Sequence, residues 1–301
     1  MDAKDLKVFQ AVARTGGMNS AADILNTVQS NVTARIRALE QELAVKLFDR
    51  HSRGVTLTRA GERLLPYAKK IEVLIQEAKR AAGDDGMPRG PLTIGSLETT
   101  AAQRLSPIIT AFGTQFRDVD LVLRTATNAA LVDQVAASEL DGAFVCAPVK
   151  HPDIVGELAF REELVIAAPP EMRSLKQLLD GAQLKIVVKG PGCAYRGRLE
   201  ELLARRGLTP TGIMEFGTLE AIIGCVQAGL GVTLLPRGLL RKQQGQLSIL
   251  TLPTSEARIE IMFVRRRDAV PFSAMEAFLQ FAIQPNAFAE AAEYAAIRAL
   301  D

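Results

Sequence analysis

Amide, hydroxyl and guanidinium side chains gather on one face of a short segment near the start of this 301-residue chain. Apolar residues recur there at spacings of four, four, three and four between Val28 and Leu43, which predicts an amphipathic helix that begins near Thr27. Short polar side chains near a helix start let the helix enter a DNA major groove, where amides and guanidinium groups read bases or hold phosphates. A generic surface helix with a polar outer face is the alternative interpretation. The candidate DNA contacts here are Gln29, Ser30, Asn31, Thr33, Arg35 and Arg37.

A basic turn follows this segment. Arg50-His51-Ser52-Arg53-Gly54 lies between Leu47-Phe48 and the strand-like Val55-Thr56-Leu57-Thr58. A basic loop between two short strands forms a wing, which suits phosphates or a minor groove, so Arg50 and Arg53 join the candidate DNA contacts. Upstream, the periodicity predicts helices over 3–14 and 21–25, the second of them capped by Asn19 or Ser20. Together these segments outline a winged helix-turn-helix.

Four short motifs stand in order across this region: Val28-Gln29-Ser30-Asn31, Ile36-Arg37-Ala38-Leu39-Glu40, Leu47-Phe48-Asp49-Arg50 and Leu57-Thr58-Arg59-Ala60-Gly61. The series resembles the N-terminal domain of LysR-type transcriptional regulators. The resemblance implies a regulator that binds double-stranded DNA at a pseudo-palindromic promoter site, as a dimer or tetramer, and that responds to a small-molecule effector. It also makes RNA polymerase a candidate partner. Val28 and Ser30 depart from the Ser and Pro that are commonest at these positions of the family.

A long helix is predicted after the wing. Leu64, Ala68, Ile71, Ile75, Ala78 and Ala82 recur at spacings of four, three, four, three and four, which is typical of a two-stranded helical interface. We therefore expect a homodimer that forms through this linker helix, and the family resemblance implies a homotetramer. The alternative is that these apolar residues pack against the DNA-binding domain of the same chain. Pro66 should kink or loosen the helix near its start. The Gly- and Pro-rich segment 83–91 cannot continue a helix and predicts a domain boundary.

Strand-like and helix-like segments alternate beyond this boundary. The expected strands are 92–95, 121–123, 143–146, 164–167, 185–188, 213–216, 232–235 and 258–264, and the expected helices are 101–116, 128–137, 174–179, 195–206, 219–228 and 273–283. We expect two parallel-type sheets in two lobes, with the last strand and helix returning to the first lobe. A ligand then favours the cleft between the lobes.

The expected fold class is α/β overall, with an N-terminal all-α winged helix-turn-helix and a long linker helix before a two-lobed α/β effector domain of the periplasmic-binding-protein type. The predicted domains are a DNA-binding domain over 1–60, a linker helix and hinge over 61–90 and an effector-binding domain over 91–301. Within the last, lobe 1 covers about 91–162 and 265–301, and lobe 2 about 163–264. The tail 285–301 is rich in Ala and Glu and is expected to form an extra helix of unassigned use.

Several predicted strands end where a helix begins, and free backbone N–H groups at such junctions attract anions. The family resemblance places the effector at these strand ends. Hydroxyl groups there favour a small organic acid, whereas Glu98 would select an amine, so the expected effector is a small organic acid or an amino acid. Each of these residues taken singly is also explained as a helix cap. The candidate effector contacts are Ser96, Thr99, Thr100, Thr127, Cys193, Phe216 and Thr218.

Composition and motifs bound the remaining function classes. The net charge is only +2, but residues 1–90 hold 15 Lys and Arg against 11 Asp and Glu. No metal-ligand spacing, Gly-rich phosphate loop or Gly-x-Ser-x-Gly elbow occurs, so we predict no enzyme activity, no cofactor and no metal site. No stretch approaches the roughly 20 apolar residues of a membrane span, and the charged start argues against a signal peptide, so a cytoplasmic protein without a membrane partner is expected. Cys193 beside the cleft keeps a thiol-based redox-sensing regulator as an alternative, and a solute-binding module is a further one, disfavoured by the DNA-reading segment.

Overall fold

The computed structural model describes residues 1–51, 54–180, 184–243 and 245–283. Its backbone contacts divide the chain into two compact units, one of Met1–Asp84 and a second that begins at Asp85. Each unit has its own hydrophobic core.

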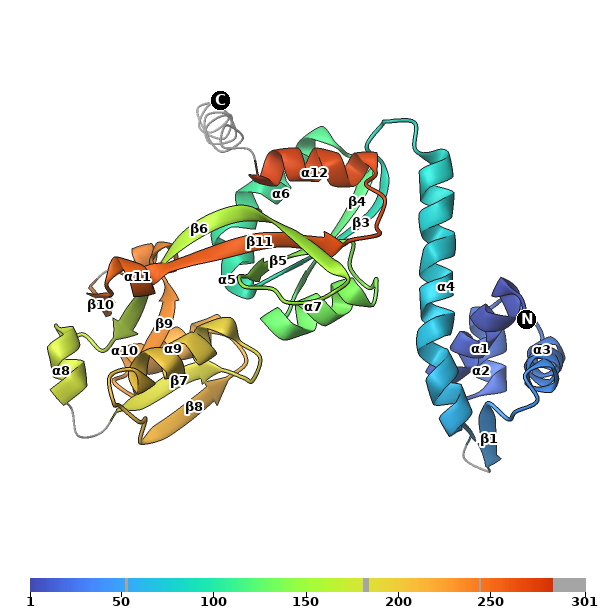
Figure 1. Ribbon diagram of the computed structural model, residues 1–301, viewed down its shortest axis with the longest axis horizontal. Coiled ribbons are helices and arrows are strands. Elements are labelled where there is room, and N and C mark those ends of the chain that lie inside the picture. Colours follow the sequence, from blue (N-terminus) through green and yellow to red (C-terminus); the bar gives the residue numbers. More distant parts are fainter. Residues whose placement is uncertain (52–53, 181–183, 244, 284–301) are drawn as a thin grey trace. The chain divides into compact units, whose positions relative to one another are not determined.

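The first unit is a winged helix-turn-helix followed by a long helix (Figure 1). Its elements are α1 (Ala3–Thr15), α2 (Met18–Ile24), α3 (Gln29–Glu42), β1 (Phe48–His51), β2 (Gly54–Leu57) and α4 (Arg59–Gly83). The strands β1 and β2 pair antiparallel from Phe48↔Leu57 to His51↔Gly54. Apolar side chains from all three short helices meet in one core, with Phe9 and Ile36 fully buried in it.

Two local expectations in this unit are wrong. Gly17 is the N-cap residue of α2, so Asn19 and Ser20 lie inside the helix and cap nothing. Val28 is the N-cap residue of α3 and 65% exposed, although the periodicity assigned it to the apolar face. The reason is that the chain is extended at Val28, with φ −93° and ψ 149°, so the 100° rotation per residue starts only at Gln29. Val32, Ile36 and Leu39 do face the core.

The two halves of the apolar seam predicted on α4, from Leu64 to Ala82, have different surroundings. Ala68 is fully buried, and Leu64 and Ile71 pack with it against the core of the first unit. Ala78 and Ala82 are exposed. The helix runs on through Pro66 (Figure 1). The first half of the seam therefore packs onto its own unit, which was the alternative interpretation, and only its second half is open to solvent.

The second unit is an α/β structure of two lobes (Figure 1). Its strands are β3 (Gly90–Ser96), β4 (Val119–Thr125), β5 (Gly142–Cys146), β6 (Ile154–Ala168), β7 (Lys185–Lys189), β8 (Gly212–Phe216), β9 (Thr233–Pro236), β10 (Ser248–Thr251) and β11 (Arg258–Arg266). Its helices are α5 (Glu98–Thr100), the π-helical η1 (Ala101–Leu105), α6 (Ser106–Gln115), α7 (Asn128–Ala136), α8 (Leu175–Asp180), α9 (Ala194–Ala204), α10 (Leu219–Gln227), the 3-10 helix η2 (Arg237–Gln243), α11 (Thr254–Ala257) and α12 (Ser273–Ile283).

The described strands form one sheet in the order β10-β6-β11-β5-β3-β4, with β9 also paired to β6, and a separate β7-β8 pair. Among these strands the parallel pairs are β3-β4, β3-β5 and β7-β8, and Ile186 forms an isolated parallel bridge with Val232, whereas β6, β9, β10 and β11 pair antiparallel. The expectation of two parallel-type sheets is therefore wrong. The physical reason is β6, which spans 15 residues and pairs antiparallel with β11 in one lobe and with β9 and β10 in the other.

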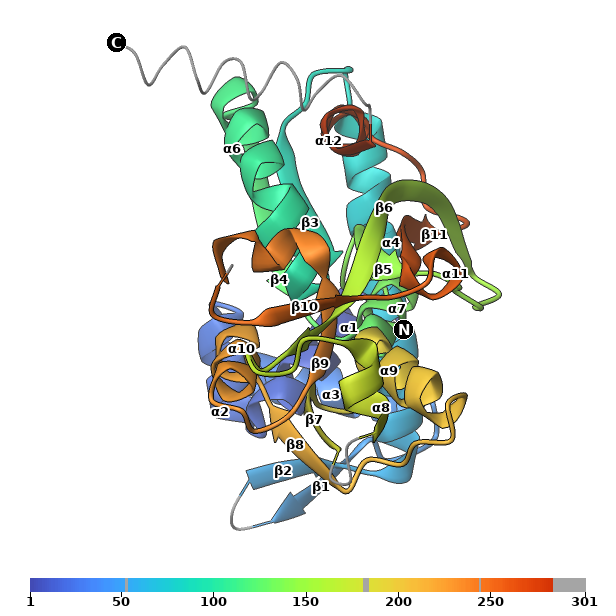
Figure 2. The same ribbon diagram turned by 90° about the vertical axis from the view of Figure 1, so that its left-hand side faces the viewer.

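We call the part built on β3, β4 and β5 the first lobe, and the part built on β7, β8, β9 and β10 the second lobe. β11 pairs with β5 from Ile261 to Val264, so it runs in the sheet of the first lobe. The helices α6 and α12 pack side by side there (Figure 1 and Figure 2), with the rings of Phe112 and Phe278 edge to face at 5.3 Å. Gly142 lies against the Phe263 ring, which leaves no room for a side chain. The predicted tail helix 285–301 lies outside the described residues.

Candidate functional site

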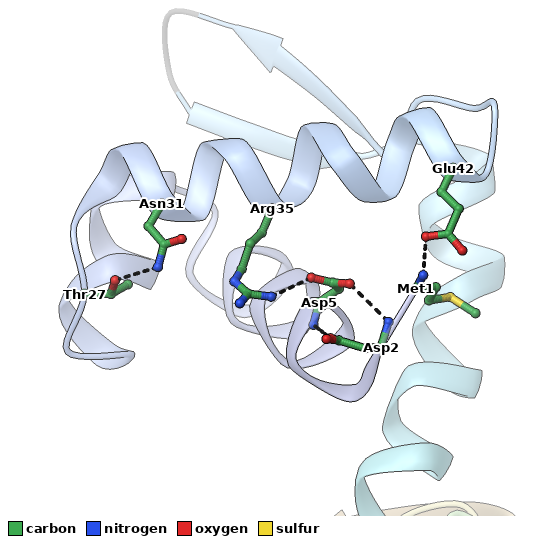
Figure 3. Close-up of polar contacts among 7 residues, drawn as sticks. All are labelled: Met1, Asp2, Asp5, Thr27, Asn31, Arg35 and Glu42. Atoms are coloured by element: carbon green, nitrogen blue, oxygen red, sulfur yellow. Dashed lines mark hydrogen bonds and ion pairs between the residues drawn. The ribbon is translucent and has the colours of Figure 1, made fainter.

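The N-terminal turns of α3 present the predicted amides to solvent. Gln29, Ser30 and Asn31 are exposed. The Gln29 Nε2 donates to Thr33 Oγ1 at 3.0 Å, and the Asn31 Nδ2 donates to Thr27 Oγ1 at 3.0 Å (Figure 3). Each amide nitrogen is thus held by one threonine hydroxyl on an exposed helix start.

Arg35 has a different position from that expected of a DNA contact. Its Nη1 donates to Asp5 Oδ1 at 2.7 Å, and the side chain points from α3 towards α1 (Figure 3). Asp5 also accepts from the Asp2 N–H at 3.1 Å, while Asp2 accepts from the Asp5 N–H at 2.8 Å, which completes a capping box at the start of α1. Arg35 therefore fixes α3 against α1, and Arg37 is left as the exposed guanidinium of this helix.

A buried carboxylate joins α3 to the wing. Glu40 is 5% exposed and accepts from the backbone N–H groups of Leu47 at 2.9 Å and Phe48 at 3.3 Å. Lys46 Nζ lies 3.3 Å from the same carboxylate. In the sequence, Glu40 is distinguished only as the last residue of the Ile36–Glu40 motif. Its place next to Leu39 on the apolar face was the one available signal that it is buried.

The wing itself is short. Arg50 and His51 belong to β1, and Arg50 is exposed. The ring of His51 lies 2.8 Å from Thr56 Oγ1 across the strand pair. Arg53 lies outside the described residues, so its predicted role stays a prediction. Across the residues that the structure describes, no group of three or more His, Cys, Asp and Glu side chains is placed to hold a metal ion.

A cleft lies between the two lobes of the second unit, and residues of both lobes line it. Three of the seven candidate effector contacts, Thr99, Thr127 and Cys193, are on its wall. Thr127 also caps α7, because its Oγ1 accepts from the Ala130 N–H at 3.4 Å. The full lining is Leu97, Glu98, Thr99, Ala126, Thr127, Val188, Lys189, Cys193, Ala194, Tyr195, Arg196, Leu219, Ile222, Thr233, Leu234 and Leu235.

The other four candidates are not among these lining residues. Ser96 is fully buried and donates to the Leu97 carbonyl at 2.9 Å. Thr100 is also fully buried. Phe216 packs against the core of the second lobe. Thr218 caps α10 by accepting from the Ala221 N–H at 3.3 Å, which is the helix-cap alternative.

An ion pair crosses the cleft. Glu98 at the start of α5 belongs to the first lobe, and Lys189 at the end of β7 belongs to the second, yet the Lys189 ammonium contacts the Glu98 carboxylate directly. Glu98 Oε1 also accepts from the Leu219 N–H at 3.4 Å, at the start of α10. The charge of Glu98 is evident in the sequence, but its pairing with Lys189 is not, because the two residues lie 91 positions apart.

A second polar link starts from the cleft wall. The Tyr195 hydroxyl lies 3.1 Å from Thr99 Oγ1 and donates to Glu162 Oε2 at 3.4 Å. Glu162 is buried on β6, and its Oε1 lies 3.9 Å from Arg104 Nε. Burial raises the pKa of Glu162 and raises that of Tyr195 well above its ordinary value. No periodicity marks a buried Glu in the middle of a strand, so sequence reasoning could not find this link.

Two family models match the chain. The one described as "Bacterial regulatory helix-turn-helix protein, lysR family" covers residues 3–62, and the one described as "LysR substrate binding domain" covers 85–285. The chain belongs to the LysR family. The predicted family and fold class are thereby confirmed, and this LysR-type transcriptional regulator combines a DNA-binding helix-turn-helix with an effector-binding domain.

Curated relatives match this LysR-type regulator over nearly its whole length. It is 41% identical over 281 residues to the HTH-type transcriptional regulator GltR of Bacillus subtilis, covering 93% of this chain and 95% of the relative. It is 43% identical over 281 residues to the HTH-type transcriptional regulator YofA of Bacillus velezensis, covering 93% and 96%. These relatives are transcriptional regulators, not enzymes.

Solved structures share the fold of this LysR-type regulator. A full-length OxyR variant from Pseudomonas aeruginosa superposes with a TM-score of 0.68 at 22% identity, over 92% of this chain and 93% of that one. Full-length CbnR in complex with its target DNA superposes with a TM-score of 0.67 at 21% identity, over 94% and 99%. None of the described helices is long and apolar enough to cross a membrane.

Proposed function

We propose that this regulator binds a pseudo-palindromic promoter site as a dimer or tetramer, and that a small organic acid or amino acid in the lobe cleft adjusts this binding. In this proposal residues 1–60 read DNA, 61–90 form the linker helix and hinge, and 91–301 bind the effector, with lobe 1 over about 91–162 and 265–301 and lobe 2 over about 163–264. RNA polymerase is proposed as a partner on the family resemblance alone.

The exposed amides of α3 carry the DNA part of the proposal. Gln29 and Asn31 are oriented by neighbouring threonine hydroxyls, and Arg37 and Arg50 are exposed guanidinium groups nearby in sequence. Amides discriminate between bases, whereas guanidinium groups on phosphates add affinity for any sequence. The proposal therefore gives Gln29, Ser30, Asn31 and Thr33 a role in specificity and Arg37, Arg50 and Arg53 a role in affinity, with Arg35 as a positioning residue.

The solvent side of α4 supports self-association. Tyr67 is 66% exposed and Leu74, seven residues later, is 52% exposed. Ala78 is exposed one turn further along. Apolar residues seven apart on an exposed helix suit a second helix, and two paired units would place two DNA readers on successive half-sites.

The charged pair across the cleft carries the effector part. A ligand bound to Glu98, Lys189 and the Leu219 N–H contacts both lobes at once. Its binding therefore favours one arrangement of the two lobes over others. Thr99, Thr127 and Cys193 offer further polar contacts on the same wall. Ser96, Thr100, Phe216 and Thr218 do not line this wall, so the proposal gives them no direct contact with the effector.

One experiment tests the proposal as a whole. The full-length protein is footprinted on the DNA that flanks its own gene, with and without a panel of small organic acids and amino acids. We expect a protected pseudo-palindromic site whose extent changes with one class of compound. Equal affinity for all DNA sequences at moderate salt would contradict the proposed binding to a specific promoter site.

The oligomer is tested separately. Leu74→Glu should shift the sedimentation equilibrium of the protein towards the monomer, because it places a charge in the proposed helix pairing. Gln76→Glu, which adds the same charge at an exposed position on the other side of the helix, is the matched control. An unchanged oligomer in the Leu74 variant would contradict the α4 interface.

A further inference from the structure

We propose that the effector of this cleft is a free α-amino acid with an apolar side chain. This inference rests on the proposed function, because it names the ligand class of the same site. It follows from three properties of the cleft wall: one opposite-charge pair, the engagement of the other charged side chain, and the placement of the two paired charges on opposite lobes beside mainly apolar side chains.

The first property is the balance of charge across the cleft. Glu98 and Lys189 neutralise each other, and their side chains are 30% and 28% exposed. A ligand that enters between them separates two half-buried charges, and each separated charge needs a new partner. An ammonium group satisfies Glu98 and a carboxylate satisfies Lys189. A simple carboxylic acid would satisfy Lys189 but leave the Glu98 carboxylate beside a second negative charge.

The second property is that Arg196, the remaining charged residue of the lining, is already engaged. Its Nε lies 3.0 Å from Glu200 and its Nη1 lies 2.7 Å from Glu215. These hydrogen bonds to two carboxylates raise the pKa of Arg196. The Tyr195 hydroxyl is likewise engaged, with Thr99 and Glu162. The charged side chains of the wall can therefore bind one ammonium group, at Glu98, and one carboxylate, at Lys189.

The third property is where each charge lies. Lys189 and the Leu219 N–H both belong to the second lobe, so the carboxylate of the ligand would sit there, at the start of α10. Glu98 belongs to the first lobe and would receive the ammonium group. Beside the hydroxyls of Thr99, Thr127, Thr233 and Tyr195, most of the remaining wall is apolar and suits an aliphatic or aromatic side chain. Its apolar side chains are those of Leu97, Val188, Leu219, Ile222, Leu234 and Leu235.

Calorimetric titration of the full-length protein with matched probes tests this. The panel is L-leucine, L-valine, L-methionine and L-phenylalanine, together with the two halves of leucine, 3-methylbutylamine and 4-methylpentanoate. We expect at least one of the amino acids to bind. Each half-analogue of leucine should bind at least about tenfold more weakly than leucine, since it loses one hydrogen-bonded charge.

Variants locate the two contacts. Glu98→Gln should bind the amino acid about tenfold more weakly than the wild type, and its affinities for leucine and 4-methylpentanoate should differ less. In Lys189→Gln it is the affinities for leucine and 3-methylbutylamine that should differ less. Glu98→Gln is isosteric, Lys189→Gln shortens the side chain, both positions are partly exposed, and a thermal melt checks folding. Glu201→Gln breaks an exposed ion pair with Arg205 on α9 and is the matched control, with no expected effect on the titration.

The outcomes separate this inference from the proposed function. Equal or tighter binding of 4-methylpentanoate than of leucine would overturn the amino-acid inference and leave an organic-acid effector in place. Binding of no apolar amino acid would also overturn it. Succinate and citrate are therefore added to the panel. The proposed function is contradicted together with this inference only when these acids also leave the melting temperature and the DNA footprint unchanged.

Discussion

Arg35 Nη1 lies 2.7 Å from Asp5 Oδ1, which ties the middle of the predicted DNA-reading helix to the first turn of α1. The side chains of the pair are 35% and 19% exposed. A guanidinium held in this way positions α3 against α1, and its part in DNA binding stays a prediction.

The first prediction follows from that pairing. Arg35→Met should weaken binding to the cognate site and lower stability by about 1 kcal/mol or less, while leaving the slope of log K against log salt unchanged. Arg50→Ala should make the same slope shallower by about one. Fluorescence anisotropy over a KCl series measures both. Arg117→Met, which removes an exposed guanidinium from the second unit, is the control. A slope that falls by about one in the Arg35 variant would show a phosphate contact instead.

A second prediction concerns the buried carboxylate of Glu40. Glu40→Ala leaves the N–H groups of Leu47 and Phe48 without their acceptor, which costs about 2 kcal/mol. Amide exchange at these two residues, followed by mass spectrometry, should accelerate at least about tenfold, and DNA affinity should fall because the wing is released. Asp23→Ala, an exposed change on α2, is the control. Unchanged exchange in this segment would mean that the strand pair alone holds the wing.

The third prediction is a pH dependence that originates at Glu162. Burial raises its pKa above the ordinary value of 4.5, more than Arg104 and Tyr195 lower it. The folded state therefore holds this proton more tightly than the unfolded state, so the contribution of Glu162 to stability is fully present below pH 4.5 and is lost as pH rises through the folded-state pKa.

Glu162→Gln removes the titrating group, so its melting temperature should change less with pH and exceed that of the wild type near neutrality. Differential scanning calorimetry from about pH 4.5 to about pH 7.5 measures this. Glu163→Gln, on the same strand but exposed, is the control. Parallel curves for wild type and the Glu162 variant would contradict the prediction.

A fourth prediction concerns the reactivity of the Cys146 thiol. Burial, with a contribution from Glu162, raises the pKa of the Cys146 thiol to about 12, and the thiolate is the reactive form. Iodoacetamide at mildly alkaline pH should therefore leave Cys146 unmodified in the folded protein and modify it in urea. Peptide mass spectrometry reads out both states. An intramolecular disulfide of Cys146 after mild peroxide treatment would instead favour the redox-sensing alternative.

Much of the local structure could be predicted from the sequence. The helix expected at 219–228 is α10 (Leu219–Gln227), and the strand expected at 258–264 is β11 (Arg258–Arg266). The pairing of strands could not be predicted, because periodicity reports which side of a segment is buried and not what covers it. The strand β10 and the first half of β6 were missed for a related reason, since their burial is uneven along the chain.

The site shows the same division. The rule that ligands meet strand ends placed Thr99, Thr127 and Cys193 on the cleft wall. It could not predict the contact of Glu98 with Lys189, which depends on how two lobes close over each other. Nor could a helix pattern show that Arg35 turns inward to Asp5, since residues at the border of the polar face can pack either way.

The strands β6 and β11 stay hydrogen-bonded from Ile154↔Arg266 to Glu163↔Arg258, and β6 then continues into the second lobe. Ala159 is the extra residue where the register shifts between Ile261 and Met262. A movement of one lobe against the other must therefore twist a paired ribbon and not swing a loose tether. Any rotation between the lobes therefore loads the hydrogen bonds of this ribbon, and Ala159 marks the point at which its ladder is already interrupted.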